Sequence, residues 1–287
     1  MPGLSQADIG ALFLAACRAE LAALKPGNVH VHAGGHGMEA AQFEAAAVAA
    51  APLIAASGVK VGERIRRAVE ASLAAAGCNT NLGILLLCAP LAAAAERASP
   101  HGLRGRLRDV LNDFDEQDAA AVFAAIRMAN PGGLGSVPEQ DVAAPPSMEL
   151  LEAMGLAADR DRIARTYVTD YAEIFDFGLP VLANARAQTS DPELAVTTLH
   201  MAFLAYFPDS HIARKHGPAV AEDVRAAARD TAPLWQPVAR CNTLPGLLDF
   251  DADLKHRNLN PGTTADIVVA TLFSAALCDA LGLSGVS

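Results

Sequence analysis

Hydrophobic residues recur at intervals of three and four along most of the chain, which is the spacing of one face of an α-helix. The first such pattern runs from Ser5 to about Leu24, and Leu12, Ala15 and Ala19 form its apolar face. The SQAD at its beginning has the form of a capping box, in which side chains satisfy the free backbone amides of a helix start. The pattern therefore predicts that the chain opens with a helix.

The rest of the chain repeats this organisation, with apolar stretches separated by polar loops rich in glycine and proline. No alternation of apolar and polar residues longer than VHVH occurs, and no strand–helix–strand rhythm. We therefore predict an all-α fold, a compact multi-helix bundle in which residues 1–287 form a single domain. Further helices are expected over about 38–57 with a kink near Pro52, 61–76, from just after Asn79 onward, 115–128, 148–156, 160–175, 191–206, 218–230, 247–256 and 264–282.

The longest irregular stretch is NPGGLGSVPEQDVAAPPS, residues 130–147. Its glycines and prolines cannot continue a helix. We interpret it as a loop or lid, with a substrate loop or a subdomain joint as the alternatives.

Composition supports a globular protein with a large core. Hydrophobic residues make up 52% of the chain and charged residues 19%, so disorder is not expected. The formal net charge of −10 leaves no electrostatic surplus to attract nucleic-acid phosphates, which argues against a nucleic-acid partner. A small phosphorylated substrate, held by a local basic cluster, is compatible with this charge.

The cysteines and apolar runs favour the reducing cytoplasm. The cysteine count of 5 is odd and no CxxC pair occurs, so neither a disulfide framework nor a cysteine zinc site is indicated. MPGLSQADIG lacks the basic and apolar regions of a signal peptide. ILLLCAPLAAAA is apolar but shorter than the roughly 20 residues of a membrane span, so we predict a buried core helix there and no membrane partner.

The first polar loop is KPGNVHVHAGGHG, residues 25–37. Lys25 offers a positive charge, Gly27 permits close backbone approach, and Asn28 offers a donor and an acceptor. These residue types suit contact with a phosphorylated ligand. The histidines of the same loop suggest a transition-metal site, although loop histidines more often serve as hydrogen bonders; they are His30, His32 and His36.

The second polar loop, GCNTNLG at 77–83, interrupts two apolar helical stretches. If Asn79 or Thr80 caps the following helix, free backbone N–H groups lie beside Asn79, Thr80 and Asn81. Such a helix start attracts anions, including phosphate. Capping alone is the alternative. A cap requires only one of these side chains, so it does not explain the others.

The third polar loop is FPDSHIARKHG, residues 207–217, in which Asp209 precedes a basic cluster of Arg214, Lys215 and His216. In so acidic a chain, three neighbouring basic groups indicate a phosphate-binding patch. The alternative is a solvated helix end, where cations offset the helix dipole.

The fourth polar loop lies within HRNLNPGTTADIVVATLF, residues 256–273. A Pro-Gly turn leads into TTAD, which has capping-box form from Thr263 to Asp266. Capping explains these two residues and leaves Asn258 and Asn260 without a structural role. The Asp266 carboxylate is also of a type that binds divalent cations.

Taken in order, KPGNV, GCNTNLGILLL, PDSHIARKHG and FDADLKHRNLNPGTTADIVVATLF resemble the motifs of the triphosphoribosyl-dephospho-CoA synthase family, over nearly the whole chain. That family makes the prosthetic-group precursor of citrate lyase and malonate decarboxylase. The resemblance implies an all-helical transferase that joins ATP to 3′-dephospho-CoA, expels adenine and transfers the triphosphoribosyl group. ATP is then a substrate, and Mg²⁺ is expected with it.

Loss of adenine develops positive charge on the sugar carbon, and the departing base needs a proton. Carboxylates suit both tasks, so Asp209 and Asp266 are our candidate catalytic residues and also our candidate Mg²⁺ ligands. Phosphates would be gripped by Lys25, Arg214 and Lys215. The other candidate nucleotide-binding residues are Gly27, Asn28, His30, Asn79, Thr80, Asn81, Gly83, Asn258, Asn260, Gly262 and Thr263.

Departures from the family pattern open other functions. Citrate lyase-type members have H-x-D-M after the KPG motif, whereas this chain has His36-Gly-Met38 and lacks that aspartate. The 130–147 stretch looks more like archaeal and methylotroph relatives. The first alternative is therefore transfer to another phosphorylated acceptor in tetrahydromethanopterin- or methanofuran-type C1 cofactor biosynthesis. A metal-dependent enzyme using the loop histidines and a non-catalytic nucleotide-binding protein are the others. Alanine-rich helix faces also allow a homodimer.

Overall fold

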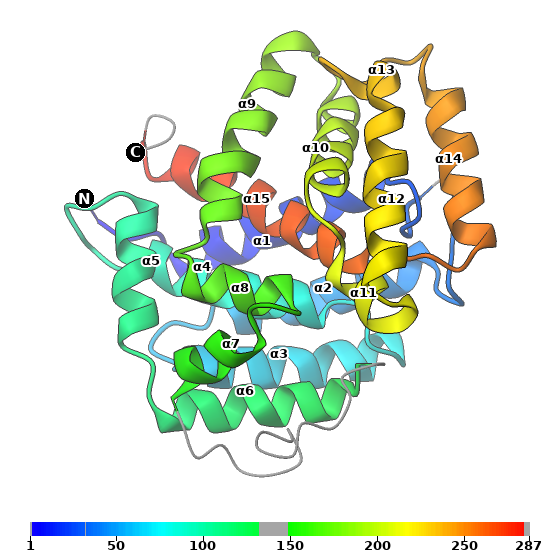
Figure 1. Ribbon diagram of the computed structural model, residues 1–287. Helices are drawn as coiled ribbons and strands as arrows, with labels where there is room; N and C mark the ends of the chain where they lie inside the picture. The colour runs from blue at the N-terminus through cyan, green and yellow to red at the C-terminus, as the bar shows by residue number, and fades with distance from the viewer. Residues whose placement is uncertain (1, 32, 132–148, 284–287) are drawn as a thin grey trace.

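The computed structural model describes residues 2–31, 33–131 and 149–283 of the chain. These residues form fifteen α-helices and one π-helical segment without a β-strand, which confirms the all-α prediction (Figure 1). The helices are α1 Gln6–Ala22, α2 Ala40–Ile54, α3 Val61–Ala76, α4 Leu82–Glu96, α5 Leu103–Asn112, α6 Glu116–Ala129, α7 Leu150–Ala157, α8 Arg162–Val168, the π-helical η1 Glu173–Gly178, α9 Leu179–Gln188, α10 Pro192–Tyr206, α11 Ser210–His216, α12 Pro218–Asp230, α13 Ala232–Trp235, α14 Leu244–His256 and α15 Gly262–Ala280.

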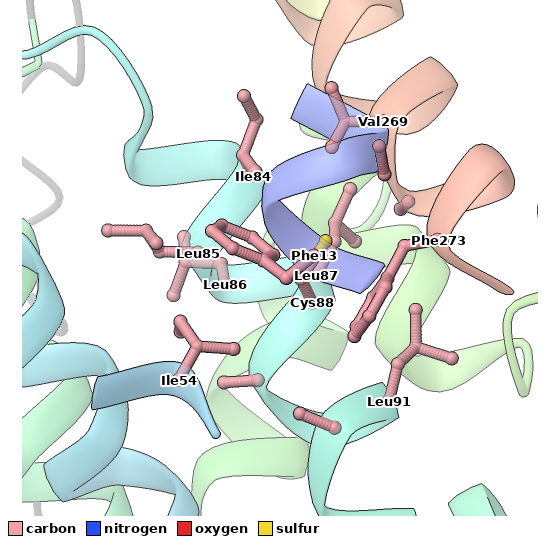
Figure 2. Close-up of a cluster of buried hydrophobic side chains, with 14 of the residues drawn as sticks. Phe13, Ile54, Ile84, Leu85, Leu86, Leu87, Cys88, Leu91, Val269 and Phe273 are labelled. Carbon is pink, nitrogen blue, oxygen red and sulfur yellow. The ribbon is translucent and has the colours of Figure 1, made fainter. Parts of the chain in front are cut away.

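Helix α4 is the centre of the larger core. Every residue from Leu82 to Ala95 is buried, which explains why this stretch is apolar on all sides. Figure 2 shows Phe13 of α1 and Phe273 of α15 beside the α4 side chains. The two aromatic rings pack edge to face, with their centroids 5.8 Å apart. The prediction of a buried core helix at ILLLCAPLAAAA is confirmed.

A second hydrophobic cluster lies among the C-terminal helices. It includes Met201 of α10, Val224 of α12, Trp235 of α13 and Leu254 of α14. In Figure 1 these helices stand on one side of the crossing pair α1 and α15, with α3 and α6 on the other side. Loops from both sides are therefore brought toward the beginning of α15.

The helix starts follow the sequence signals at some positions and not at others. Ser5 caps α1 by accepting from the Asp8 backbone N–H at 3.2 Å, and Asp115 forms a capping box with Asp118 at α6, as predicted. The capping prediction at Thr263 was wrong, because α15 already begins at Gly262 and carries no side-chain cap from its own residues.

The single helix predicted over 160–175 was also wrong. The α-helix ends at Val168, and Asp170 and Tyr171 take positive φ values of 51° and 57° before η1 begins. The Tyr171 hydroxyl donates to the carbonyl of Leu87 at 3.1 Å, so tertiary contacts with the core fix this break. The helices α5, α9, α11 and α13 were not predicted. Most of the 130–147 stretch lies outside the described residues.

Among the described helices, α15 is long and apolar enough to cross a membrane by length and composition alone. Its hydrophobic window is 72% buried within the fold. This burial is typical of the core helix of a globular protein.

Candidate functional site

The four polar loops of the sequence surround one cavity of about 1300 Å³. Its wall also includes the C-terminal end of α1 and parts of α6, α7 and α8. The predicted site residues that line it are Asn28, Asn79, Thr80, Asn81, Gly83, Arg214, Lys215, Asn260, Gly262, Thr263 and Asp266. The predicted residues outside its lining are Lys25, Gly27, His30, Asp209 and Asn258.

The start of α4 presents polar groups to this cavity. The Asn79 side chain accepts from the Leu82 backbone N–H at 3.2 Å and so caps the helix, while Asn81 donates to Ser72 Oγ at 3.1 Å. The Thr80 hydroxyl is buried and has no partner among the described residues. Capping therefore accounts for Asn79, whereas the buried hydroxyl of Thr80 is left without a hydrogen bond among the described residues.

Asp266 lies one turn into α15 and packs directly on the start of α4. A Cβ atom added to Gly83 would lie 2.1 Å from Asp266 Oδ2, so only glycine leaves room for this carboxyl group. Within the part of the chain that the structure describes, the half-buried Asp266 side chain forms no hydrogen bond. Burial first, and then the charges of Asp209 and Glu20, raise its pKa well above the ordinary value.

Asp209 has the opposite environment. Its side chain is 0% exposed, and Oδ1 caps α11 by accepting from the backbone N–H groups of His211 at 2.8 Å and Ile212 at 3.0 Å. Its Oδ2 accepts from the backbone N–H of Thr264 at 2.7 Å and from the Thr264 hydroxyl at 2.8 Å. Asp209 thus caps α15 as well, in the role that the sequence pattern assigned to Thr263.

Lys25 is fully buried beneath the cavity rather than in its wall. Its ammonium group pairs with the Glu20 carboxylate and donates to Asn28 Oδ1 at 3.1 Å. Asn28 in turn donates to Asn260 Oδ1 at 2.8 Å. Burial lowers the pKa of Lys25 and raises that of Glu20, and their mutual attraction partly offsets both shifts. Of this pair, Glu20 is the member that lines the cavity.

The remainder of the first loop is tied to α14. The Gly27 backbone N–H donates to Asp251 Oδ1 at 2.8 Å, while His30 Nε2 lies 3.3 Å from Asp251 Oδ2. Gly27 has a φ of 83°, and a Cβ atom there would lie 2.8 Å from Pro261 Cδ. Gly27 and His30 therefore join the first loop to α14 from outside the cavity.

His30 and His36, the two loop histidines that the structure describes, face different partners. His36 Nδ1 lies 2.9 Å from Asn258 Oδ1 and its Nε2 lies 2.8 Å from the Gly27 carbonyl, whereas His30 faces Asp251. His32 lies outside the described residues. Among residues 2–31, 33–131 and 149–283, no three His, Cys, Asp or Glu side chains are grouped to hold a metal ion.

A basic rim borders the cavity and is larger than the sequence pattern indicated. Arg214 lines the wall and pairs with Asp161 at 3.1 Å. Arg160, Arg165 and Lys215 also line it; they are exposed and form no ion pair within the described ranges. Arg160 and Arg165 were missed, although the run DRDRIAR at 159–165 is a visible charge signal.

Another part of the wall is apolar. The side chains there come from α2, α4, α6 and α7, and they are Phe43, Leu86, Phe123, Ile126 and Met154. The sequence analysis placed these positions within predicted helices and not among the candidate site residues. A cavity with one apolar and one charged region suits a ligand that carries both a ring system and phosphates.

Comparison with known proteins shows a shared fold and a family. A crystal structure of a candidate triphosphoribosyl-dephospho-CoA synthase from Archaeoglobus fulgidus matches with 24% identity and a TM-score of 0.63, over 84% of this chain and 99% of the other. At that identity, the match shows a shared fold. No protein with a curated description matches the chain. The family model for ATP:dephospho-CoA triphosphoribosyl transferase, CitG, matches residues 6–284, so the chain belongs to this transferase family, as its four loops predict.

Proposed function

We propose that the chain carries out the reaction of its family in the cavity between α4, α11 and α15. The bond from the ATP sugar carbon C1′ to adenine breaks, and C1′ bonds to a ribose hydroxyl oxygen of 3′-dephospho-CoA. Adenine takes up a proton, the hydroxyl loses one, and the triphosphate stays intact. The volume of about 1300 Å³ supports two bound nucleotides, since it exceeds the about 300–1,000 Å³ of ordinary ligand pockets.

The single observation that carries this proposal is the placement of Asp266. A carboxyl group that is sheltered, free of hydrogen bonds to the described residues and close to acidic neighbours has a raised pKa, which favours its protonated form. Such a group is suited to donate that proton to a departing base. Asp266 is therefore our catalytic acid, and Asp209 is assigned to holding α11 and α15 together.

The exposed cations of the rim would hold the triphosphate. Arg160, Arg165 and Lys215 have no carboxylate partner within the described residues, so their charges are available to an anion. Thr80 and Asn260, which also line the cavity, would contact the sugar or phosphates. Lys25, which the sequence suggested as a phosphate ligand, is instead assigned the role of ion-pair partner to Glu20.

The proposal for Mg²⁺ differs from the one drawn from the sequence. Asp209 already accepts four hydrogen bonds, and the described residues offer no group of three metal-ligating side chains. The described residues therefore supply no cation cage, and on this proposal Mg²⁺ enters bound to the ATP phosphates. We assign no chemical step to it.

Incubation of the purified chain with ATP and 3′-dephospho-CoA tests the proposal. The expected result is adenine and a triphosphoribosyl adduct of dephospho-CoA in equal amounts, measured by chromatography and mass spectrometry. Release of adenine with unchanged dephospho-CoA would support the cleavage of ATP and would mean that the acceptor is a different molecule. Absence of adenine release from ATP in the presence of 3′-dephospho-CoA would overturn the proposal.

A further inference from the structure

The proposed reaction needs a second proton-handling group. As the hydroxyl oxygen of the acceptor bonds to C1′, its proton must leave. Asp266 is occupied as the proton donor to adenine and cannot accept that proton in the same step. A different basic group in the cavity wall is therefore required, and this inference rests on the proposed function.

Most acidic groups of the wall are already engaged. Asp161 caps α8 through Oδ1 and pairs with Arg214 through Oδ2. Glu222 pairs with Arg225, and Asp159 is exposed. None of these three combines a free oxygen atom with shelter from solvent.

Glu20 combines a free carboxylate oxygen with shelter from solvent. It lies near the end of α1, is 4% exposed, and lines the cavity. Lys25 holds its Oε1 atom, while Oε2 forms no hydrogen bond within the described ranges. Burial raises the pKa of Glu20, and the buried ammonium group of Lys25 opposes that shift and so favours the charged carboxylate. Glu20 is thus a sheltered carboxylate with one oxygen anchored and the other available.

The anchor itself is fixed in place. Lys25 also donates to Asn28, and Asn28 donates to Asn260, which lines the cavity beside the start of α15. This chain of contacts joins α1 to the loop before α15 across more than two hundred residues of sequence. It orients the Glu20 carboxylate relative to the helix that carries Asp266.

We propose that Glu20 accepts the proton of the acceptor hydroxyl while Asp266 protonates adenine, with Lys25 as the residue that positions Glu20. The C1′–O bond forms as the C1′–N bond breaks; Glu20 gains one proton and Asp266 loses one. Exchange with solvent then restores both groups. The negative charge of Glu20 also helps to keep the pKa of Asp266 raised, so the two carboxyl groups reinforce their opposite roles.

The test compares Glu20→Gln and Glu20→Ala with Glu44→Gln, a control that removes the exposed α1–α2 ion pair to Arg18. We expect Glu20→Gln to lower kcat about 10²–10⁴-fold, with KM for both substrates nearly unchanged. Formate added to Glu20→Ala should restore activity, since a small carboxylate can occupy the vacated space and accept the proton. A purely structural role would not produce this rescue. Glu44→Gln should retain wild-type kinetics.

Because Glu20→Gln or Glu20→Ala leaves Lys25 buried without its partner and can impair folding, the double variant Glu20→Gln with Lys25→Met serves as a second test. It is expected to fold and to have the same low kcat. Near wild-type kcat in Glu20→Gln or in the double variant would overturn the inference, and so would the absence of formate rescue in folded Glu20→Ala. Failure of the wild-type chain to release adenine would instead refute the proposed function.

Discussion

The two aspartates near the starts of α11 and α15 have the same side chain and opposite surroundings. Asp209 accepts four hydrogen bonds and has no exposed surface. Asp266 accepts none from the described residues and faces the cavity. The number of donors around a carboxylate therefore separates a group that holds the fold from one that is free for chemistry.

The largest expected effect is on catalysis at Asp266. Asp266→Asn keeps the size of the side chain but removes the proton that adenine needs, so kcat should fall about 10²–10⁴-fold. The chain should remain folded, because the side chain already favours its neutral form. Adenine release and the unfolding free energy measure the two effects. A kcat within about threefold of wild type would remove Asp266 from the proposed mechanism.

The raised pKa of Asp266 adds a pH dependence. Only the protonated acid is active, so kcat should decrease as pH rises through the pKa of Asp266 in the folded protein. A pKa raised on folding also contributes stability that is present at low pH and lost as pH rises through the folded value. The unfolding free energy of wild type relative to Asp266→Asn should therefore decrease with rising pH, and a flat difference would contradict the assigned environment.

Gly83 tests the position of the same carboxyl group. In Gly83→Ala the new methyl group would lie 2.1 Å from Asp266 Oδ2 and displace it. Because a misplacement of about 1 Å can cost about 10²-fold in rate, kcat should fall by that order. Gly155→Ala in α7 is the matched control, since a Cβ atom there meets nothing within 4 Å. Equal kinetics for the two variants would mean that Asp266 tolerates the shift.

Asp209 should show a different kind of loss. In Asp209→Asn, an NH2 group replaces one carboxylate oxygen and cannot accept a hydrogen bond from the buried N–H groups of α11 or α15. Leaving those donors unsatisfied should lower the unfolding free energy by about 1–3 kcal/mol. Asp191→Asn is the control, because Asp191 caps only α10 and asparagine caps a helix about as well. Denaturant unfolding measures both. A variant with full stability but no activity would return Asp209 to the list of catalytic residues.

The sequence predicted the elements whose signals are local and missed those fixed by distant partners. The cap at Asp115 and the apolar run of α4 are visible in a few consecutive residues, and both predictions were confirmed. The double cap by Asp209 depends on Thr264, which lies 55 positions away. A residue pattern at PDSH gives no information about such a donor, so a catalytic and a structural aspartate look alike in sequence.

The candidate site divides in the same way. The motif loops placed most predicted residues in the cavity wall, because polar groups gathered at a helix start are visible in sequence. Glu20 was missed because a single glutamate in an amphipathic helix has the pattern of a solvated position. Its burial and its pairing with Lys25 arise only when α1 packs beneath the cavity. Ionisable groups below a site thus need the fold before they can be recognised.

The smallest expected effects concern the cations of the rim. Arg165 and Lys215 are exposed, so water and salt screen their attraction for phosphate. Arg165→Ala and Lys215→Ala should each raise KM for ATP about 1.5–5-fold, the equivalent of roughly 0.2–1 kcal/mol, and leave kcat nearly unchanged. Arg229→Ala is the control, because Arg229 is exposed on α12 and away from the cavity. The difference between rim and control variants should shrink as salt is raised; a salt-independent difference would mean that these residues act through local structure and not through charge.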